Sequence, residues 1–157
     1  MGDGNLGNYP RCQYLRIYFN PKQRDYLNQV KSLLGEYFSK TPYERYRKDA
    51  GVVYLEIAKK NITKLIGFPT GSKIRNKIKI PDWIFDNEDY LKVCLRGLFD
   101  TSHNPYLIKD IFIALTKLGF HPYTRRACVE LGRMSEVKQF FDIMAPRNQN
   151  HYRFNVL

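Results

Sequence analysis

The chain has no long apolar run, few cysteines and a shortage of acidic residues. None of its hydrophobic runs approaches the roughly 20 residues that cross a membrane, and its first residues lack the charged and apolar zones of a signal peptide. Its three cysteines, Cys12, Cys94 and Cys128, lie far apart without paired spacing, which favours buried thiols of a reducing compartment over a zinc site or a disulfide framework. These absences predict a cytoplasmic protein with no membrane partner.

The shortage of acids leaves 26 Lys and Arg against 15 Asp and Glu, a formal net charge of +11. Such an excess favours a polyanionic partner, because each neutralised phosphate releases counterions. The alternative is the charged surface of a thermostable protein, but such surfaces usually balance the two signs. At 157 residues the chain fits one domain or two small halves, and nucleic acid is its expected partner.

The same succession of helix, hairpin and helix is predicted twice along the chain. Asn20-Pro21 and Asn104-Pro105 each offer a capping asparagine and a proline suited to the first helical position. Downstream, Pro122-Tyr123 repeats Pro42-Tyr43, and "LEIAKKNITKLI" aligns with "VELGRMSEVKQF" without a gap. The alignment pairs Glu56 with Glu130, Lys59 with Arg133, Lys64 with Lys138, and the predicted caps Asn61 and Ser135. We interpret this as an internal duplication, with halves at 1–80 and 81–157.

The first half predicts a four-stranded sheet with helices on its apolar side. In "QYLRIYFN" apolar and polar residues alternate, and "GNLGNYPRC" before it is the expected hairpin partner. The next two strands are expected in "ERYRKDAGVVYLEIAKK". The predicted polar face carries Tyr14, Arg16, Tyr18, Tyr43, Arg45 and Arg47. A two-stranded ribbon fits the DNA major groove, where Arg reads guanine and contacts phosphate; the alternative for each arginine is an ordinary surface position.

Between the halves, four basic residues alternate strictly in "PTGSKIRNKIKIPDWI". They are Lys73, Arg75, Lys77 and Lys79. One interpretation is a solvated linker, and the other is an extended segment that lies along a phosphate backbone. The sequence does not decide between them.

The segment "LRGLFDTSH", from Leu95 to His103, resembles the signature motif of the LAGLIDADG homing endonucleases, whose second copy often reads like LRGLFDTDG. The opening "MGDGNLGN" is similar to the tail of the first copy, and "IPDWI", "LGF" and "IMAPRNQNHYRF" resemble segments of archaeal and intein-type members. The resemblance implies two pseudo-symmetric αββαββα halves of α+β class, with antiparallel sheets that form a DNA-binding saddle. Because Ser102 is followed so soon by Asn104-Pro105, the second half should lack its first hairpin.

In this family, the acid next to last in each motif binds a divalent metal, Mg²⁺, which serves hydrolysis of DNA phosphodiester bonds. The resemblance puts Asp3 at the first such position and Ser102, which is neutral, at the second. The second site should therefore be degenerate, and any remaining activity should nick DNA rather than cut both strands. Asp100 lies about 200° around the helix from Ser102 and is expected to serve structure.

The family's motif helices pack side by side, so Gly97 is expected to allow a partner helix to approach; the alternative is a core helix with a tolerated glycine. Lys59 is the second catalytic candidate, with a helix-flanking lysine as the alternative, and His103 and His121 are expected at the surface or on DNA. The expected partner is double-stranded DNA, or intron RNA if the chain is a non-catalytic module, and the chain is expected to be a monomer or a homodimer. The predicted DNA contacts are Arg11, Arg16, Tyr18, Arg45, Arg47, Lys48, Lys73, Arg75, Lys77, Arg125 and Arg126.

Overall fold

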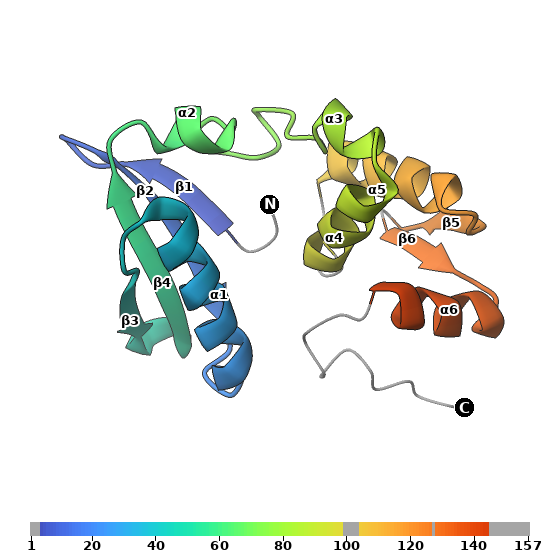
Figure 1. Ribbon diagram of the computed structural model, residues 1–157, viewed down its shortest axis with the longest axis horizontal. Helices are drawn as coiled ribbons and strands as arrows, with labels where there is room; N and C mark the ends of the chain where they lie inside the picture. The colour runs from blue at the N-terminus through green and yellow to red at the C-terminus, as the bar shows by residue number, and fades with distance from the viewer. Residues whose placement is uncertain (1–3, 99–103, 127, 145–157) are drawn as a thin grey trace. The chain divides into compact units, whose positions relative to one another are not determined.

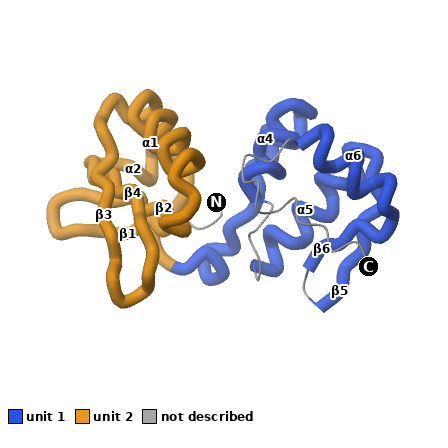
Figure 2. The backbone as a smooth tube through the Cα atoms, turned by 90° about the horizontal axis from the view of Figure 1, so that it is seen from below, with its two compact units in different colours: residues 1–2, 72–157 blue, residues 3–71 orange. Residues whose placement is uncertain are grey.

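The computed structural model describes residues 4–98, 104–126 and 128–144, and it divides the chain into two compact units (Figures 1 and 2). The boundary falls between Gly71 and Ser72. The first unit along the chain, up to Gly71, is orange and keyed as unit 2 in Figure 2, and the second unit, from Ser72 on, is blue and keyed as unit 1. Each unit combines helices with an antiparallel sheet, so the predicted α+β class is confirmed.

The first unit is built on a four-stranded antiparallel sheet with the order β1-β2-β4-β3. Its strands are β1 (Gly4–Asn8), β2 (Gln13–Phe19), β3 (Tyr43–Arg47) and β4 (Val52–Lys59). The predicted hairpin partner of "QYLRIYFN" is β1, and β4 lies between β2 and β3. Residues that pair directly across an antiparallel sheet project to the same face; Leu15 pairs with Ile57, and Arg16 with Glu56. The predicted four-stranded sheet is therefore present.

One face of this sheet packs against α1 (Arg24–Phe38) and α2 (Ile62–Ile66). Leu27 of α1 lies against Val53 and Leu55, and Ile62 of α2 lies in a cluster with Ile57. Leu55 and Ile62 are completely buried. Each such side chain contributes ~1.5–3 kcal/mol of transfer free energy, so the apolar face is what holds the helices in place.

Of the two predicted helix starts in the first unit, the one at Asn20-Pro21 is wrong, and the one at Asn61 is confirmed in position but not in its side-chain bond. The helix expected to begin at Pro21 begins at Arg24: the Gln23 N–H bonds the Asn20 carbonyl (2.9 Å) and closes a separate turn, and the next bond runs from the Leu27 N–H to the Gln23 carbonyl (3.0 Å). At α2 the N-cap residue Asn61 has a left-handed backbone (φ 59°) and makes no side-chain cap bond. Gln13 of β2 takes its place, since its Oε1 accepts both the N–H and the hydroxyl of Thr63 at 3.1 Å.

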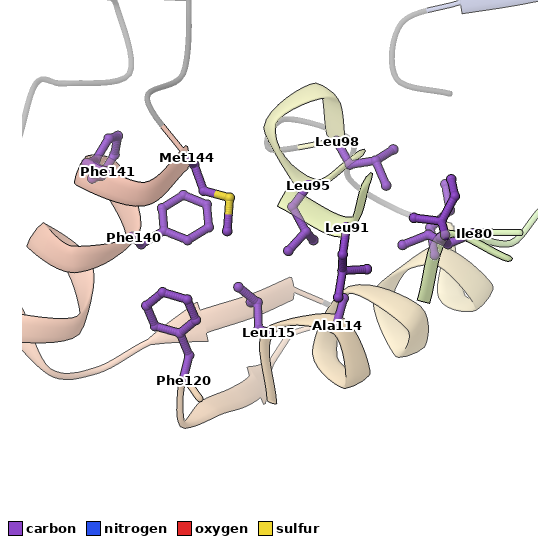
Figure 3. Close-up of a cluster of buried hydrophobic side chains, with 12 residues drawn as sticks. Ile80, Leu91, Leu95, Leu98, Ala114, Leu115, Phe120, Phe140, Phe141 and Met144 are labelled. Carbon is purple, nitrogen blue, oxygen red and sulfur yellow. The ribbon is translucent and has the colours of Figure 1, made fainter. Parts of the chain in front are cut away.

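The second unit contains four helices and a two-stranded sheet within its described residues. Side chains from α4, α5 and α6 converge on one apolar cluster, with Phe120 at its edge (Figure 3). Leu91 and Met144 are completely buried there. The elements are α3 (Asp82–Phe85), α4 (Glu88–Leu98), α5 (Pro105–Lys117), β5 (Pro122–Arg125), β6 (Cys128–Leu131) and α6 (Met134–Met144).

The predicted cap of α5 is confirmed, whereas that of α6 is wrong. Asn104 Oδ1 accepts the Tyr106 N–H (3.1 Å), and Pro105 occupies the first helical position. Helix α6 already begins at Met134, so Ser135 lies inside its first turn.

Residues 73–77 form a tight turn and are not extended. The Ile78 N–H bonds the Lys73 carbonyl (2.9 Å), the Lys77 N–H bonds the Ile74 carbonyl (3.0 Å), and Lys77 has φ 48°. This is the hydrogen-bond pattern of a Schellman motif, which excludes an extended conformation for residues 73–77. The chain then joins the core of the second unit, because Asn104 Nδ2 donates to the Ile78 carbonyl and Asp110 Oδ2 accepts the Ile80 N–H.

The order helix, strand, strand, helix occurs in both units, as α1-β3-β4-α2 and as α5-β5-β6-α6. In each hairpin a tyrosine lies directly opposite a glutamate: Tyr43 pairs with Glu56, and Tyr123 with Glu130. These are the residues that the sequence alignment matches. The described part of the second unit contains no counterpart of β1 and β2.

Candidate nucleic-acid interface

The face of the first sheet opposite α1 and α2, here called the open face, carries the polar side chains of three strands. Tyr14, Arg16 and Tyr18 of β2 pair with Ala58, Glu56 and Tyr54 of β4, respectively, so all six project to one side. The register of β3 adds Tyr43, Arg45 and Arg47. The sequence-based assignment of residues to this face is confirmed, and no described helix of the first unit packs on it.

A buried carboxylate lies near the middle of the open face. Glu56 is only 4% exposed, and its Oε2 accepts hydrogen bonds from Arg16 Nε and from the Tyr9 hydroxyl. Arg16 Nη2 donates to the same tyrosine oxygen at 2.7 Å. Because a buried charge needs an opposite charge and hydrogen bonds, Arg16 is what makes Glu56 tolerable at this position.

Tyrosine rings surround the arginine of this ion pair. The guanidinium carbon of Arg16 lies 4.3 Å from the ring centre of Tyr14 and 5.3 Å from that of Tyr54, within the range of a cation–π interaction. Tyr9 packs on Tyr14 with ring centres 4.7 Å apart. Gly7 makes room for this arrangement, since a Cβ at that position would lie 2.4 Å from the Tyr14 ring.

The environment fixes the protonation of Arg16 and Tyr9. Partial burial opposes the charge on Arg16, but the hydrogen bonds to Glu56 and Tyr9 outweigh burial and raise the pKa of the guanidinium. Burial and the Glu56 carboxylate raise the pKa of Tyr9. Because Arg16 is paired with Glu56, the excess positive charge of the open face comes from its other arginines.

The remaining predicted contacts of the first unit lie on or beside the open face. Arg45 is exposed, and its guanidinium makes no ion pair with the residues that the structure describes. Arg47 holds Asp49 through Nε and Nη2. Lys48 follows β3, Arg11 lies between β1 and β2, and both are exposed.

The other predicted contacts belong to the second unit. Lys73, Arg75 and Lys77 lie in the Schellman turn, whereas Arg125 ends β5 and Arg126, with φ 46°, follows it. The structure thus gathers Arg16, Tyr18, Arg45 and Arg47 on one sheet but not these five residues.

The contacts of Lys59 are those of a helix-flanking lysine. Its Nζ donates to the carbonyl of Phe38, the last residue of α1 (3.3 Å), where backbone carbonyls have no partner within the helix. Asp3, Ser102, Asp100 and His103 lie outside the described residues. Among the described residues no three His, Cys, Asp or Glu side chains form a group that could hold a metal ion.

The predicted surface position of His121 is confirmed, whereas the prediction for the cysteines needs an adjustment. The His121 side chain is exposed, its Nδ1 lies 2.7 Å from Glu136 Oε1, and Arg133 approaches the same oxygen at the start of α6. The three cysteines are free thiols, but Cys12 and Cys94 are only partly buried and Cys128 is exposed. Burial of Cys94 raises the pKa of its thiol to about 11.

Helix α4 presents an exposed side that includes Gly97. A Cβ at Gly97 would meet no atom within 4 Å, and Tyr90 and Val93 on the same side of the helix are 54% and 61% exposed. Leu91, Leu95 and Leu98 face the core instead (Figure 3). The partner helix that was expected against Gly97 is thus not found among the described neighbours of this residue.

Comparison with known proteins gives no matching family model and no significant match to a curated protein. In the described residues, no helix has the length and apolar character needed to span a membrane. Sequence reasoning missed Glu56 and Tyr9 as members of the site. The signal was an acid in the otherwise apolar strand "VVYLEIAK", which requires a buried partner.

Proposed function

We propose that the open face of the first unit binds double-stranded DNA and that the chain is a degenerate protein of the LAGLIDADG homing endonuclease type. The observation that carries the proposal is the gathering of Arg16, Arg45 and Arg47, with tyrosines between them, on the face of the first sheet that no described helix of the first unit covers. Arginines on a β-ribbon suit both phosphates and base edges in the major groove. The net charge of +11 adds the sequence-independent attraction to DNA.

The repeated order of elements and the matched tyrosine–glutamate pairs support two related halves. On this proposal the halves are pseudo-symmetric and the second has lost its first hairpin, so its DNA-binding sheet is half the size of the first. The two sheets together would form an asymmetric saddle. Most of the binding free energy should then come from the first unit.

Cleavage rests on the resemblance alone. It requires Asp3 as the ligand of a Mg²⁺ ion, while Ser102 removes the second carboxylate. Magnesium would activate water for hydrolysis of the phosphodiester bond. With a single carboxylate site, the proposed activity is nicking of one strand; the alternative is a module that binds DNA or intron RNA without cutting.

Binding is tested first, by fluorescence anisotropy with random duplexes over a range of salt concentrations. The affinity should fall steeply with salt, and Arg45→Ala should reduce the magnitude of the log–log salt slope by about 1. Arg24→Ala is the matched control, because Arg24 lies on α1 and pairs with Glu44. Duplex binding that is unaffected by Arg45→Ala would refute the assignment to the open face, and preference for single-stranded RNA would favour the RNA alternative.

Cleavage is tested on a supercoiled plasmid that carries a selected binding site. We expect Mg²⁺-dependent open-circle product from the natural chain and none from Asp3→Asn, with DNA binding retained. Ser102→Asp should raise the proportion of linear product. Linear product from the natural chain would contradict a degenerate second site, and binding without any cutting would favour the non-catalytic module.

A further inference from the structure

A carboxylate near the centre of a basic, DNA-binding surface needs an explanation. Glu56 repels phosphate and has lost most of its hydration at 4% exposure. Its strand, β4, pairs with β2 on one side and β3 on the other, so it cannot turn away from the surface. The role of Glu56 must therefore lie in its effect on its partner, Arg16.

The guanidinium of Arg16 is held along one edge only. Nε donates to Glu56 and Nη2 donates one bond to Tyr9; these donors form the side edge of the planar group. The end edge consists of one N–H from each of Nη1 and Nη2, and it has no hydrogen-bond partner among the residues described. The Tyr14 ring restrains the plane from a distance of 4.3 Å. The side chain is 25% exposed, so part of the group remains accessible.

We propose that Glu56 and Tyr9 position Arg16 to read a guanine, so that the open face selects duplexes with guanine at the base pair facing Arg16. Guanine presents O6 and N7 side by side in the major groove, and two adjacent N–H donors of arginine match them. An arginine that is already ordered loses less side-chain entropy when it binds. This inference rests on the proposed function and deepens it; Arg16 would touch the base, whereas Glu56 and Tyr9 act through Arg16.

Arg45 provides a matched control on the same face. It lies opposite Tyr54 in the register of β3 and β4, and among the described side chains no carboxylate holds it. An exposed arginine that no carboxylate holds suits a phosphate contact, which positions the duplex without reading its sequence.

The test begins with selection of duplexes from a random library by the natural protein. Affinities are then measured for the selected duplex, for an unrelated duplex, and for versions in which each guanine in turn is 7-deazaguanine, which lacks the N7 acceptor. Arg16→Lys should weaken binding to the selected duplex roughly tenfold and to the unrelated duplex by less than about twofold, since it keeps the charge but loses the paired donors. Glu56→Gln should lose part of the same preference, whereas Arg45→Lys, at a phosphate contact, should change both affinities by the same factor and so keep the preference.

The analogue separates base reading from a structural role. One 7-deazaguanine position should weaken binding by the natural protein and have no effect on Arg16→Lys, which a merely destabilised sheet would not produce. Tyr9→Phe keeps the ion pair and should show a smaller loss of preference, so it serves if Glu56→Gln folds poorly by circular dichroism.

Equal losses on both duplexes for Arg16→Lys would assign Arg16 to phosphate and overturn the inference. No loss on either would make the ion pair purely structural, with the same consequence. In both cases DNA binding by the open face would stand. Failure of the natural protein to bind any duplex would refute the proposed function and this inference together.

Discussion

Glu56 and Glu130 lie opposite a tyrosine in hairpins of the same register, yet their surroundings differ. Glu56 is buried and holds Arg16, which is supplied by the neighbouring strand β2. Glu130 is only partly buried and accepts a hydrogen bond from the hydroxyl of Tyr123 (2.8 Å), which raises the pKa of that tyrosine. The difference follows from strand β2, which has no counterpart in the described part of the second unit. It supplies the arginine that Glu56 binds, whereas Glu130 has only its tyrosine.

The hydrophobic cores of the two units are also built from different elements. In the first unit, one face of a sheet packs on two helices, whereas in the second unit helices supply most of the core side chains (Figure 3). There the stretch from Ile78 to Ile80 is bound by side chains of Asn104 and Asp110. In the second unit, side chains therefore hold the backbone of this stretch, whereas in the first unit neighbouring strands hold one another through backbone hydrogen bonds.

The largest expected change in stability comes from substitutions in the two hydrophobic cores, and it tests whether the cores are independent. Leu55→Ala should destabilise the first unit by about 3 kcal/mol, because Leu55 is completely buried. Leu91→Ala is the matched change in the second unit, where Leu91 is equally buried. Hydrogen exchange should show lost protection in β4 for the first variant and in α4 for the second. Equal losses in both units from either substitution would show that they unfold as one.

The next effect tests the two glutamates. Glu56→Leu should lower the free energy of unfolding by about 2 kcal/mol, since it leaves Arg16 without its counter-ion; this is below the usual range for buried pairs because the Arg16 side chain is 25% exposed. Glu130→Leu should stay within about 0.5 kcal/mol. Urea unfolding at neutral pH measures both, and equal effects would remove the distinction drawn between the hairpins.

A smaller effect compares the helical glycines Gly35 and Gly97. Replacement by alanine should stabilise each helix by about 0.5–1 kcal/mol, because a Cβ at Gly35 meets only ordinary contacts at 3.9 Å and one at Gly97 meets none. If α4 pairs with a second copy of the chain, Gly97→Ala should instead weaken that association. Light scattering at several concentrations, together with thermal unfolding, distinguishes these outcomes.

The smallest effect concerns acid stability. Hydrogen bonds from Lys31 and Arg24 lower the pKa of Glu44, and the bond to His121 lowers that of Glu136, both from an ordinary value of 4.5. A lowered carboxyl pKa stabilises the fold above the ordinary value, and the contribution is lost as pH falls through the folded-state pKa. Glu44→Gln and Glu136→Gln should each flatten the decline of the urea midpoint below about pH 4.5. A midpoint that declines unchanged in both variants would contradict these ion pairs.

The sequence predicted those features that burial or a single side chain dictates. The alternation in β2 located the open face because one side of the strand must be apolar, and Asn104-Pro105 located the start of α5. The identical signal at Asn20-Pro21 failed: Asn20 bonds the Lys22 N–H as Asn104 bonds the Tyr106 N–H, but the chain first makes a separate turn, closed by the Gln23 N–H and the Asn20 carbonyl, before α1 begins. The alternation of Lys73, Arg75, Lys77 and Lys79 left the conformation of this segment undecided, because solvated charges impose no period on the backbone.

The candidate site was predicted only in part. Arg16, Arg45 and Arg47 follow from strand alternation, but the bond between Arg16 and Glu56 depends on the pairing of β2 with β4, which spans 40 residues. Tyr9 joins from a turn that carries no periodic signal. Long-range register, rather than local preference, decides which charges meet.

Gln13 has a consequence for folding. As the first residue of β2 it bonds Thr63 at the start of α2, so helix docking depends on how β2 aligns with β4. A shift by one residue would turn Tyr14 and Arg16 toward the hydrophobic interior and would also withdraw Gln13 from Thr63. The bond between Gln13 and Thr63 therefore forms only when β2 and β4 pair in the observed register, and it couples the docking of α2 to that register.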